Sequence, residues 1–221
     1  MKTIQINLYS FEELDEKAKQ KALQAYHDLN TDYNWWDFIY DDFVTVCQYL
    51  GISVDKKTIH FEGFYSQGDG SSFGAEVDFV KLLNGIENES WREYAPKQEF
   101  GFTLPGIDKR VLTLVKDSKI ELAARIMSRK RGYGVVVDLG LDYSGETAKN
   151  HDLIYGELDK LEKWFDGVAD NLNVFLYRSL QNEYEYQTTD EAIAESIEAN
   201  DYCFTVDGKK AGRLENIAVN N

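Results

Sequence analysis

The sequence contains few of the residues that cross-link a chain, break its secondary structure or carry it across a membrane. Among its 221 residues are only 2 prolines, 2 cysteines and 3 histidines. So few prolines exclude a collagen-like or proline-rich chain. Two cysteines, Cys47 and Cys203, exclude a disulfide scaffold and a zinc site built from cysteine. No apolar run approaches the roughly 18 residues that a membrane-spanning helix needs. We therefore expect a cytoplasmic protein with no membrane segment, no metal and no cofactor.

Basic residues are also scarce beside acidic ones. The chain carries 39 acids and 24 bases, a formal net charge of -15. Residues 10–55 hold 10 acids and 3 bases and residues 151–201 hold 13 acids and 3 bases, whereas residues 105–131 hold 3 acids and 8 bases. Direct nucleic-acid binding is disfavoured, because an acidic surface repels the phosphate backbone. Two interpretations stay open: ordinary solvated helix faces, or an acidic surface that engages a basic partner protein.

The N-terminal half combines strand-like and helix-like hydrophobic patterns. Ser10 and Glu13 fit a capping box at the start of a helix, and Phe38 is expected on the buried side of the next helix. The elements that the patterns predict are a strand at 2–8, a helix from Ser10 to about residue 29, a helix at 35–50 that ends at Gly51, strands at 58–65 and 73–79 that form a β-hairpin, and an irregular stretch at 84–104.

The C-terminal half predicts a second hairpin and a long helix. Residues 119–129 alternate and would pair with 133–141, although a helix over 107–130 is the alternative. The other predicted elements are a short helix at 107–115, a long helix at about 152–184, a short helix that Thr188-Thr189-Asp190-Glu191 caps and that runs to Ala199, and a closing strand at 202–206.

These elements together predict the fold class. Strands joined by hairpins, with the helices grouped, are typical of an α+β protein with an antiparallel sheet. We expect the sheet to be packed by helices that include the long C-terminal helix. One domain is expected over residues 1–207, followed by a polar tail over residues 208–221.

The glycine-rich tip of the first hairpin is the main candidate binding site. Two glycines permit backbone angles that other residues avoid, and N–H groups exposed there can form an anion nest. The surrounding order matches neither the Walker nor the dinucleotide-binding pattern. We expect an exposed recognition loop in which Gln67 and Asp69 are dispensable for stability; a plain turn is the alternative. The candidate ligand- or partner-binding residues are Ser66, Gln67, Gly68, Asp69, Gly70 and Ser71, with Ser72 at the end of the tip.

No catalytic residues are assigned from the sequence. His60 lies two residues before Glu62 and close to Ser66, but no Gly-x-Ser-x-Gly elbow is present. Two acids one helical turn apart, Asp37 and Asp41, lack a fixed third ligand for a cation. An enzyme is therefore the less favoured hypothesis.

Two further segments are candidates for contact with a partner. The acidic and aromatic run Glu183, Tyr184, Glu185 and Tyr186 suits protein recognition, because tyrosine is enriched at interface centres. A packed helix end is the equally weighted alternative. The basic turn at 129–131 is expected to be solvated, or to pair with the protein's own acidic helices.

Several stretches together resemble one family. They are Ser10-Phe11-Glu12-Glu13-Leu14, Trp35-Trp36-Asp37, the segment from Phe61 to Gly70 that contains Ser-Gln-Gly-Asp-Gly, and Glu183-Tyr184-Glu185-Tyr186 leading into Thr189-Asp190-Glu191-Ala192. On these stretches the chain resembles a family of small proteins of tailed phages and prophages, some of them labelled antitoxin of a toxin–antitoxin stability system. The resemblance implies a phage-encoded accessory protein of the host cytoplasm. It carries over no catalytic residue.

Two classes of function therefore remain. The favoured one is a phage-encoded acidic protein that neutralises a host protein by direct contact, as an antitoxin-like or counter-defence inhibitor. The alternative is a protein that sequesters or hydrolyses a nucleotide signal at residues 66–72. A homo-oligomer is compatible with the sequence, which identifies no partner.

Overall fold

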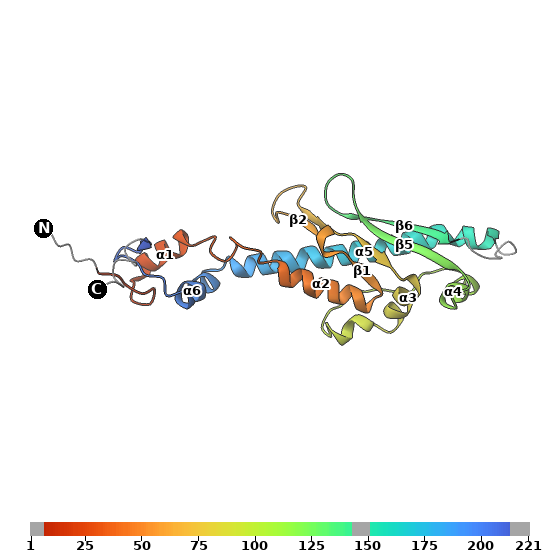
Figure 1. Ribbon diagram of the computed structural model, residues 1–221, viewed down its shortest axis with the longest axis horizontal. Coiled ribbons are helices and arrows are strands. Elements are labelled where there is room, and N and C mark those ends of the chain that lie inside the picture. The colour runs from red at the N-terminus through yellow and green to blue at the C-terminus, as the bar shows by residue number, and fades with distance from the viewer. Residues whose placement is uncertain (1–6, 143–150, 213–221) are drawn as a thin grey trace. The chain divides into compact units, whose positions relative to one another are not determined.

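The computed structural model describes residues 7–142 and 151–212 (Figure 1). Its fold is α+β, as the sequence predicts: an antiparallel sheet in the order β1-β4-β5-β6, a second sheet of β2 and β3, and a long helix near the C-terminus. The elements are α1 (Glu16–Ala25), α2 (Asp37–Tyr49), β1 (Ile52–Val54), η1 (Lys56–Thr58), β2 (His60–Glu62), β3 (Gly70–Ser72), β4 (Ala75–Val77), α3 (Phe79–Glu87), η2 (Ser90–Glu93), α4 (Lys109–Lys116), β5 (Glu121–Ser128), β6 (Val135–Asp142), α5 (His151–Gln187) and α6 (Asp190–Ala199).

The chain forms two compact units. Unit 1 comprises Met1–Trp36 and Gln181–Asn221, and unit 2 comprises Asp37–Leu180. The boundary falls within α5, after Leu180. Compactness alone does not show that a unit folds independently, so a single domain over residues 1–207 stays a prediction.

Unit 1 is built on α1 and α6. The first helix begins at Glu16 and not at Ser10, because the Asp15 carboxylate accepts the Ala18 N–H at 2.8 Å and caps the helix there. The predicted bond from the Ser10 N–H to the Glu13 carboxylate still forms, at 2.8 Å, but it stabilises a turn before the helix. The core residues of this unit are Phe11, Leu14, Ala18, Ala22, Leu23, Ile193, Ile197 and Phe204.

The two predicted outer strands of the chain, at 2–8 and 202–206, have different outcomes. Residues 2–6 of the first lie outside the described part of the chain. Tyr9 and Phe204 exchange two backbone hydrogen bonds of 2.8 Å as an isolated bridge. The strand expected at 202–206 is therefore wrong: its pairing is limited to bridges at Phe204. The polar tail is described only to residue 212.

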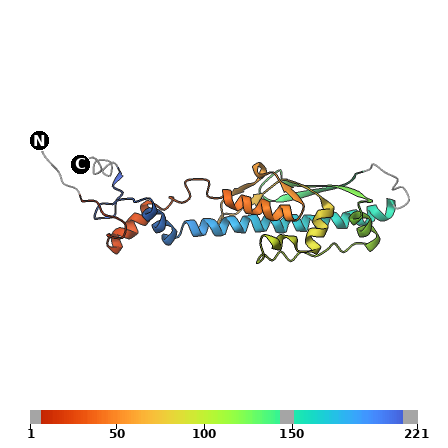
Figure 2. The same cartoon turned by 60° about the horizontal axis from the view of Figure 1, so that its bottom comes forward.

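The core of unit 2 lies between the four-stranded sheet and α5, which run along one another in Figures 1 and 2. Helical spacing places one apolar face of α5 toward this core, and the ring of Phe165 meets that of Phe79 at 5.6 Å. The buried residues on this face of the helix are Leu161, Phe165, Val168, Leu172 and Leu176. The buried residues of the sheet include Ala75, Val77, Ala124, Ile126 and Val135.

Several predicted elements of unit 2 are confirmed. The second hairpin forms as β5 and β6, so the helical alternative over 107–130 is wrong, and both α2 and α5 lie within three residues of their predicted bounds. Phe38 is an exception, because its side chain is 48% exposed. The sequence analysis also missed α3, although Asp78 caps it by accepting the Lys81 N–H at 3.0 Å.

The first predicted hairpin forms, but with a different return strand. β2 pairs with β3, which is part of the predicted tip, whereas β4 belongs to the four-stranded sheet. The chain changes sheets at Gly74, whose N–H donates to Thr58 Oγ1 at 2.8 Å and whose carbonyl accepts from that hydroxyl at 3.1 Å. These hydrogen bonds join residues that are sixteen positions apart in the chain, and no hydrophobic pattern encodes them. They divide the strand that was predicted at 73–79.

Candidate functional site

The turn between β2 and β3, which we call the clamp loop (residues 63–69), is closed by its own aspartate. Asp69 Oδ2 accepts the backbone N–H groups of Tyr65 at 2.9 Å and Ser66 at 2.6 Å. The Asp69 N–H in turn donates to the Ser66 carbonyl at 3.2 Å. Gly63 makes room for this arrangement, because its φ is 55° and a Cβ there would overlap the Asp69 carboxyl group. These internal hydrogen bonds give the loop a defined shape.

The base of the clamp loop is fixed to α5. The Ser71 side chain is buried, and its hydroxyl lies 2.9 Å from Oδ1 and 3.1 Å from the carbonyl oxygen of Asn173. Tyr177 donates its hydroxyl to the Gly63 carbonyl at 3.2 Å, and its ring packs on Phe64 at 5.5 Å. These contacts hold both ends of the loop on one helix.

The turn between β5 and β6 supports the other side of the clamp loop. The Gly134 N–H donates to the Ser71 carbonyl at 2.8 Å, and the Tyr133 hydroxyl donates to Glu62 Oε2 at 2.9 Å. Gly70 is required here, because a Cβ would lie 2.7 Å from the Tyr133 Cβ. The Ser-Gln-Gly-Asp-Gly motif thus encodes a loop braced on two sides.

Acidic groups dominate the electrostatics of the clamp loop. The hydrogen bond to Glu62 raises the pKa of Tyr133, and burial followed by the charge of Asp69 raises the pKa of Tyr177. Both phenols therefore stay protonated at neutral pH and act as donors. The surface of the loop offers carboxylates and tyrosine hydroxyls.

The predicted tip residues divide into an exposed part and a structural part. Ser66, Gln67 and Gly68 are exposed, Asp69 and Gly70 are half-buried, and Ser71 and Ser72 are buried in β3. The expectation that Asp69 is dispensable for stability changes, because its carboxylate closes the loop. The sequence analysis did not name Tyr65 as a candidate contact residue, although it is 71% exposed. Its position directly before the glycine-rich tip could have indicated that it is exposed.

A hydrolytic arrangement does not form here within the described residues. Glu62 accepts from Tyr133 and not from His60, and the Ser66 N–H is bonded to Asp69. The buried Cys47 thiol has a raised pKa because of desolvation, so it is a poor nucleophile. Within the described part of the chain, no group of three or more His, Cys, Asp or Glu residues is arranged to hold a metal ion.

The acidic and aromatic run at the end of α5, in unit 1, is not a single surface. Successive helical residues point about 100° apart, so four in a row surround the helix. Tyr184 packs on Trp35 at 5.8 Å, whereas Glu185 and Tyr186 are exposed. Glu183 accepts from the Gln187 side chain at 2.6 Å.

The basic turn at 129–131 is exposed, and its first arginine faces an acid of α5. Arg129 Nη2 lies 4.0 Å from Asp170 Oδ1, which agrees with the expected pairing to the protein's own acidic helices. Asp41, one of the two acids that lacked a third ligand for a cation, accepts from Lys56 Nζ at 2.6 Å.

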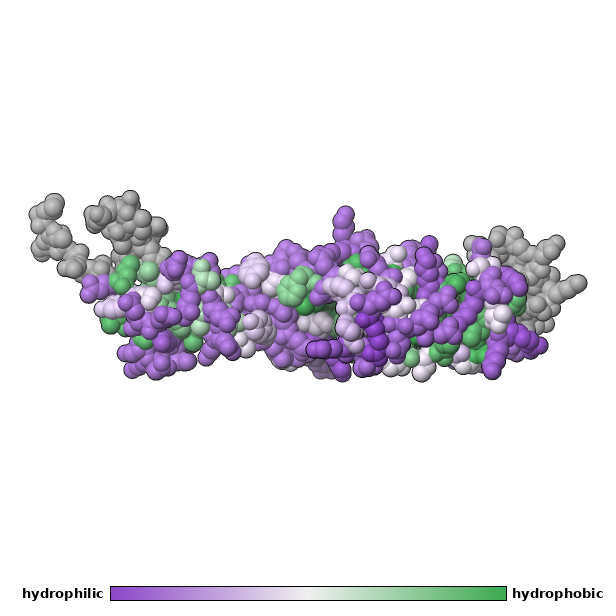
Figure 3. All heavy atoms as spheres, turned by 90° about the horizontal axis from the view of Figure 1, so that it is seen from below, coloured by the Kyte–Doolittle hydropathy of each residue, from purple (hydrophilic) through white to green (hydrophobic). Residues whose placement is uncertain are grey.

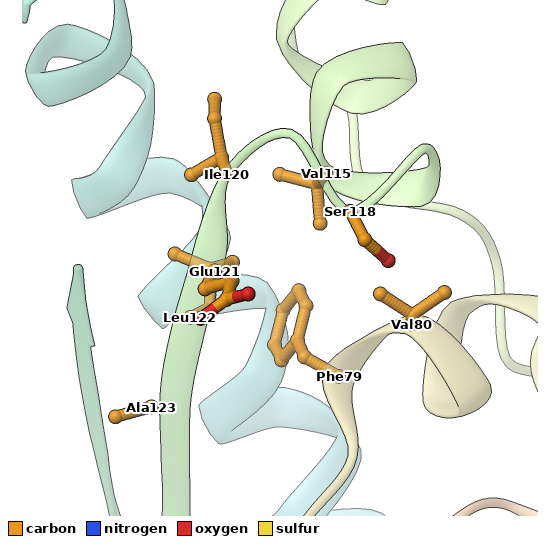
Figure 4. Close-up of a pocket in the computed structure, with 8 residues that line it drawn as sticks. All are labelled: Phe79, Val80, Val115, Ser118, Ile120, Glu121, Leu122 and Ala123. Carbon is orange, nitrogen blue, oxygen red and sulfur yellow. The ribbon is translucent and has the colours of Figure 1, made fainter. Parts of the chain in front are cut away.

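A pocket of about 280 Å³ lies between α3, α4 and the start of β5, away from the clamp loop (Figure 4). The ring of Phe79 and the side chains of Val80 and Val115 form its apolar wall, and the Ser118 hydroxyl and the Glu121 carboxylate lie among its polar groups. Ligand pockets usually hold 300–1,000 Å³. This pocket is therefore small, and no basic side chain lines it to receive a phosphate.

The sequence places the chain in a family. A family model described as a domain of unknown function, DUF8835, matches residues 35–190. The chain belongs to this family. The DUF8835 match contains all of unit 2, including the clamp loop, and ends before most of α6. No curated protein and no solved structure matches the chain significantly. Within the described residues, no helix has the length and apolar character that crossing a membrane requires.

Proposed function

We propose that this DUF8835 protein is a phage-encoded acidic binding protein that neutralises a host protein by direct contact in the host cytoplasm, in the manner of an antitoxin or a counter-defence inhibitor. The clamp loop is its contact surface. The observation that carries the proposal is the closed loop itself: Asp69 fixes its shape, and the chain displays Tyr65, Ser66 and Gln67 on it.

A fixed loop favours protein recognition on energetic grounds. Binding costs free energy for each segment that must be ordered, and a loop that is already ordered avoids that cost. Tyrosine gives a large contact area at a small entropic cost, and small polar residues beside it supply adaptable hydrogen bonds. Tyr65 with Ser66 and Gln67 has this composition.

The charge of the chain favours one kind of partner, and hydrophilic residues cover much of the face that Figure 3 shows. A net charge of -15 creates a negative potential that attracts a basic surface and repels an acidic one. Glu62 and Asp69 place part of that charge at the base of the loop. We therefore assign a basic host protein as the partner.

The alternative of a nucleotide ligand is less well supported by the loop. Two of the N–H groups that would form an anion nest already donate to Asp69. A phosphate would have to displace this carboxylate and lie beside the acid of Glu62. Sequestration or hydrolysis of a nucleotide is therefore kept as an outcome of the test.

The test compares single variants in capture from lysate of the host. Purified wild type, Tyr65→Ala and Asp69→Ala are immobilised, and retained proteins are quantified by mass spectrometry. Tyr33→Ala is the matched control, since Tyr33 is 59% exposed but lies in unit 1. A basic protein that wild type and Tyr33→Ala retain, and that both loop variants lose, supports the proposal.

Two results contradict it. One is equal retention by all four proteins, which would make the clamp loop only a turn. The other is retention of a nucleotide from a panel of nucleotides and cyclic nucleotides, lost in Asp69→Ala, which would establish the alternative. Release of that ligand as hydrolysis products would make the protein an enzyme.

A further inference from the structure

The four-stranded sheet has a long regular edge at β6. In the order β1-β4-β5-β6, this strand is bonded along one side only, and its eight residues pair with β5 without a bulge. Among the described strands, β5 alone is paired with β6. Proteins usually shorten, bulge or cover such edges. The opposite edge, β1, is only three residues long.

The outer edge of β6 presents backbone groups at alternate residues. The Arg129 N–H donates to the Gly134 carbonyl at 3.0 Å, which makes this pair a hydrogen-bonded one. In an antiparallel ladder, bonded and non-bonded pairs alternate. The N–H and C=O groups of Val137 and Leu139 therefore point away from β5. The same alternation turns the Val135 carbonyl outward, where it accepts from Arg129 Nε at 3.1 Å, so the open edge starts after Val135.

Charges alternate across the sheet toward this edge. The register places Glu76 opposite Arg125, and Arg125 opposite Asp138. Arg125 Nε is 3.1 Å from the Glu76 carboxylate. Asp138 is exposed, and within the described part of the chain its side chain has no hydrogen bond or ion pair. A further strand would bring its own residue beside Asp138, and a basic one continues the alternation.

The neighbours of Asp138 on the same face complete the pattern. Val136 is 38% exposed and lies opposite the exposed Met127, so an apolar residue fits beside it. Gly140 leaves open space, because a Cβ there would meet nothing within 4 Å. A large side chain fits beside Gly140. An added antiparallel strand passes Gly140, then Asp138, then Val136. At alternate positions it should therefore carry a large residue, a basic residue and an apolar residue, in that order.

We propose that the edge of β6 receives an extended segment of a basic partner protein as an added antiparallel strand, with arginine or lysine beside Asp138. This site is separate from the clamp loop and does not rest on the function proposed for it. A second copy of the chain is disfavoured as the occupant, because β6 contains no basic residue and each copy carries a charge of -15. Strand addition to an exposed edge is an established mode of peptide recognition.

The test uses a synthetic peptide of the complementary order, Thr-Tyr-Thr-Arg-Thr-Val-Thr, and its twin with Glu in place of Arg. Amide exchange of the ¹⁵N-labelled full chain is followed by NMR with up to about 1 mM peptide. Exchange at Val137 and Leu139 should slow about tenfold, whereas Asp138 and Gly140, which face β5, should not change. The Glu peptide loses the attraction to Asp138 and adds a repulsion of similar size, so it should bind about two- to thirtyfold more weakly.

Three variants separate the backbone from the side chains. Leu139→Pro removes an outward N–H, a change that an edge strand tolerates, and should abolish protection by the peptide. Leu139→Ala shortens the same side chain but keeps the N–H, so the peptide should still protect the edge amides of this variant. Asp138→Lys should reverse the preference so that the Glu peptide binds better. Tyr65→Ala should leave all these results unchanged, which keeps failure here distinct from failure of the clamp-loop proposal.

Two outcomes would overturn the proposal. The first is an absence of protection at Val137 and Leu139 with the Arg peptide at about 1 mM. The second is protection of both amides without peptide, together with a dimer mass by light scattering that Leu139→Pro reduces to the monomer. That second result would assign the edge to another copy of the chain.

Discussion

The clamp loop predicts a specific energetic coupling between Gly63 and Asp69. Gly63→Ala places a side chain in a left-handed conformation, with φ of 55°, which costs roughly 1–2 kcal/mol. The new Cβ would also overlap the Asp69 carboxyl group, which would have to leave the N–H groups of Tyr65 and Ser66. Loss of a comparable capping carboxylate costs about 1 kcal/mol. The substitution should therefore destabilise the protein by about 2–3 kcal/mol.

The double variant makes the coupling measurable. Asp69→Ala alone should cost about 1 kcal/mol, but it removes every atom that Gly63→Ala would displace. The pair together should cost about 2–3 kcal/mol, which leaves a coupling of about 1 kcal/mol. Urea unfolding of the four proteins at pH 7 measures it, and each kcal/mol corresponds to roughly 2–4 °C in Tm for a chain of this size.

A second glycine in the loop provides the control. Gly68 has φ of 102°, but a Cβ there would meet nothing within 4 Å. Gly68→Ala should therefore lower the free energy of unfolding through backbone strain alone, and its effect should add to that of Asp69→Ala. If the costs of Gly63→Ala and Asp69→Ala also add within about 0.5 kcal/mol, the carboxylate does not close the loop and the reasoning is refuted.

Three further outcomes are expected. Ser71→Ala should lower the free energy of unfolding by about 0.5–1.5 kcal/mol in urea, because it removes the buried hydroxyl that donates to the half-buried Asn173. The hydrogen bonds from Arg110 lower the pKa of Asp108 to about 2. The ionised carboxylate therefore stabilises the folded state above the unfolded pKa near 4, and this contribution is lost as the pH falls toward 2. In Asp108→Asn, the stability measured by circular dichroism should depend less on pH in that range. Association with a basic partner should slow as salt rises in stopped-flow measurements, since charges are screened beyond about 8 Å at physiological ionic strength; an on-rate indifferent to salt would contradict charge steering.

The sequence by itself determined the elements whose signals are local and repeated. The apolar residues of α5 recur at steps of three and four from Leu158 to Leu180, so one face of that helix had to be buried wherever it packed. The alternation in β5 and β6 is equally local, because a strand exposes every second residue. The fold class follows from these two patterns.

Only the tertiary structure decided which strands pair and what the polar motif does. Residues 70–72 and 75–77 follow one another in the chain, yet β3 and β4 join different sheets because Gly74 is bonded to Thr58, sixteen residues away. A hydrophobic pattern carries no such information.

The same limit applies to the candidate site. The sequence marked Asp69 as a polar residue beside glycines, but its role depends on where its carboxylate points, which is set by contacts across the fold. Gly63 and Tyr177 lie six and more than a hundred residues from it, and both help to hold the same loop. The loop was recognisable from its glycines, whereas its closure required neighbours that only folding brings together.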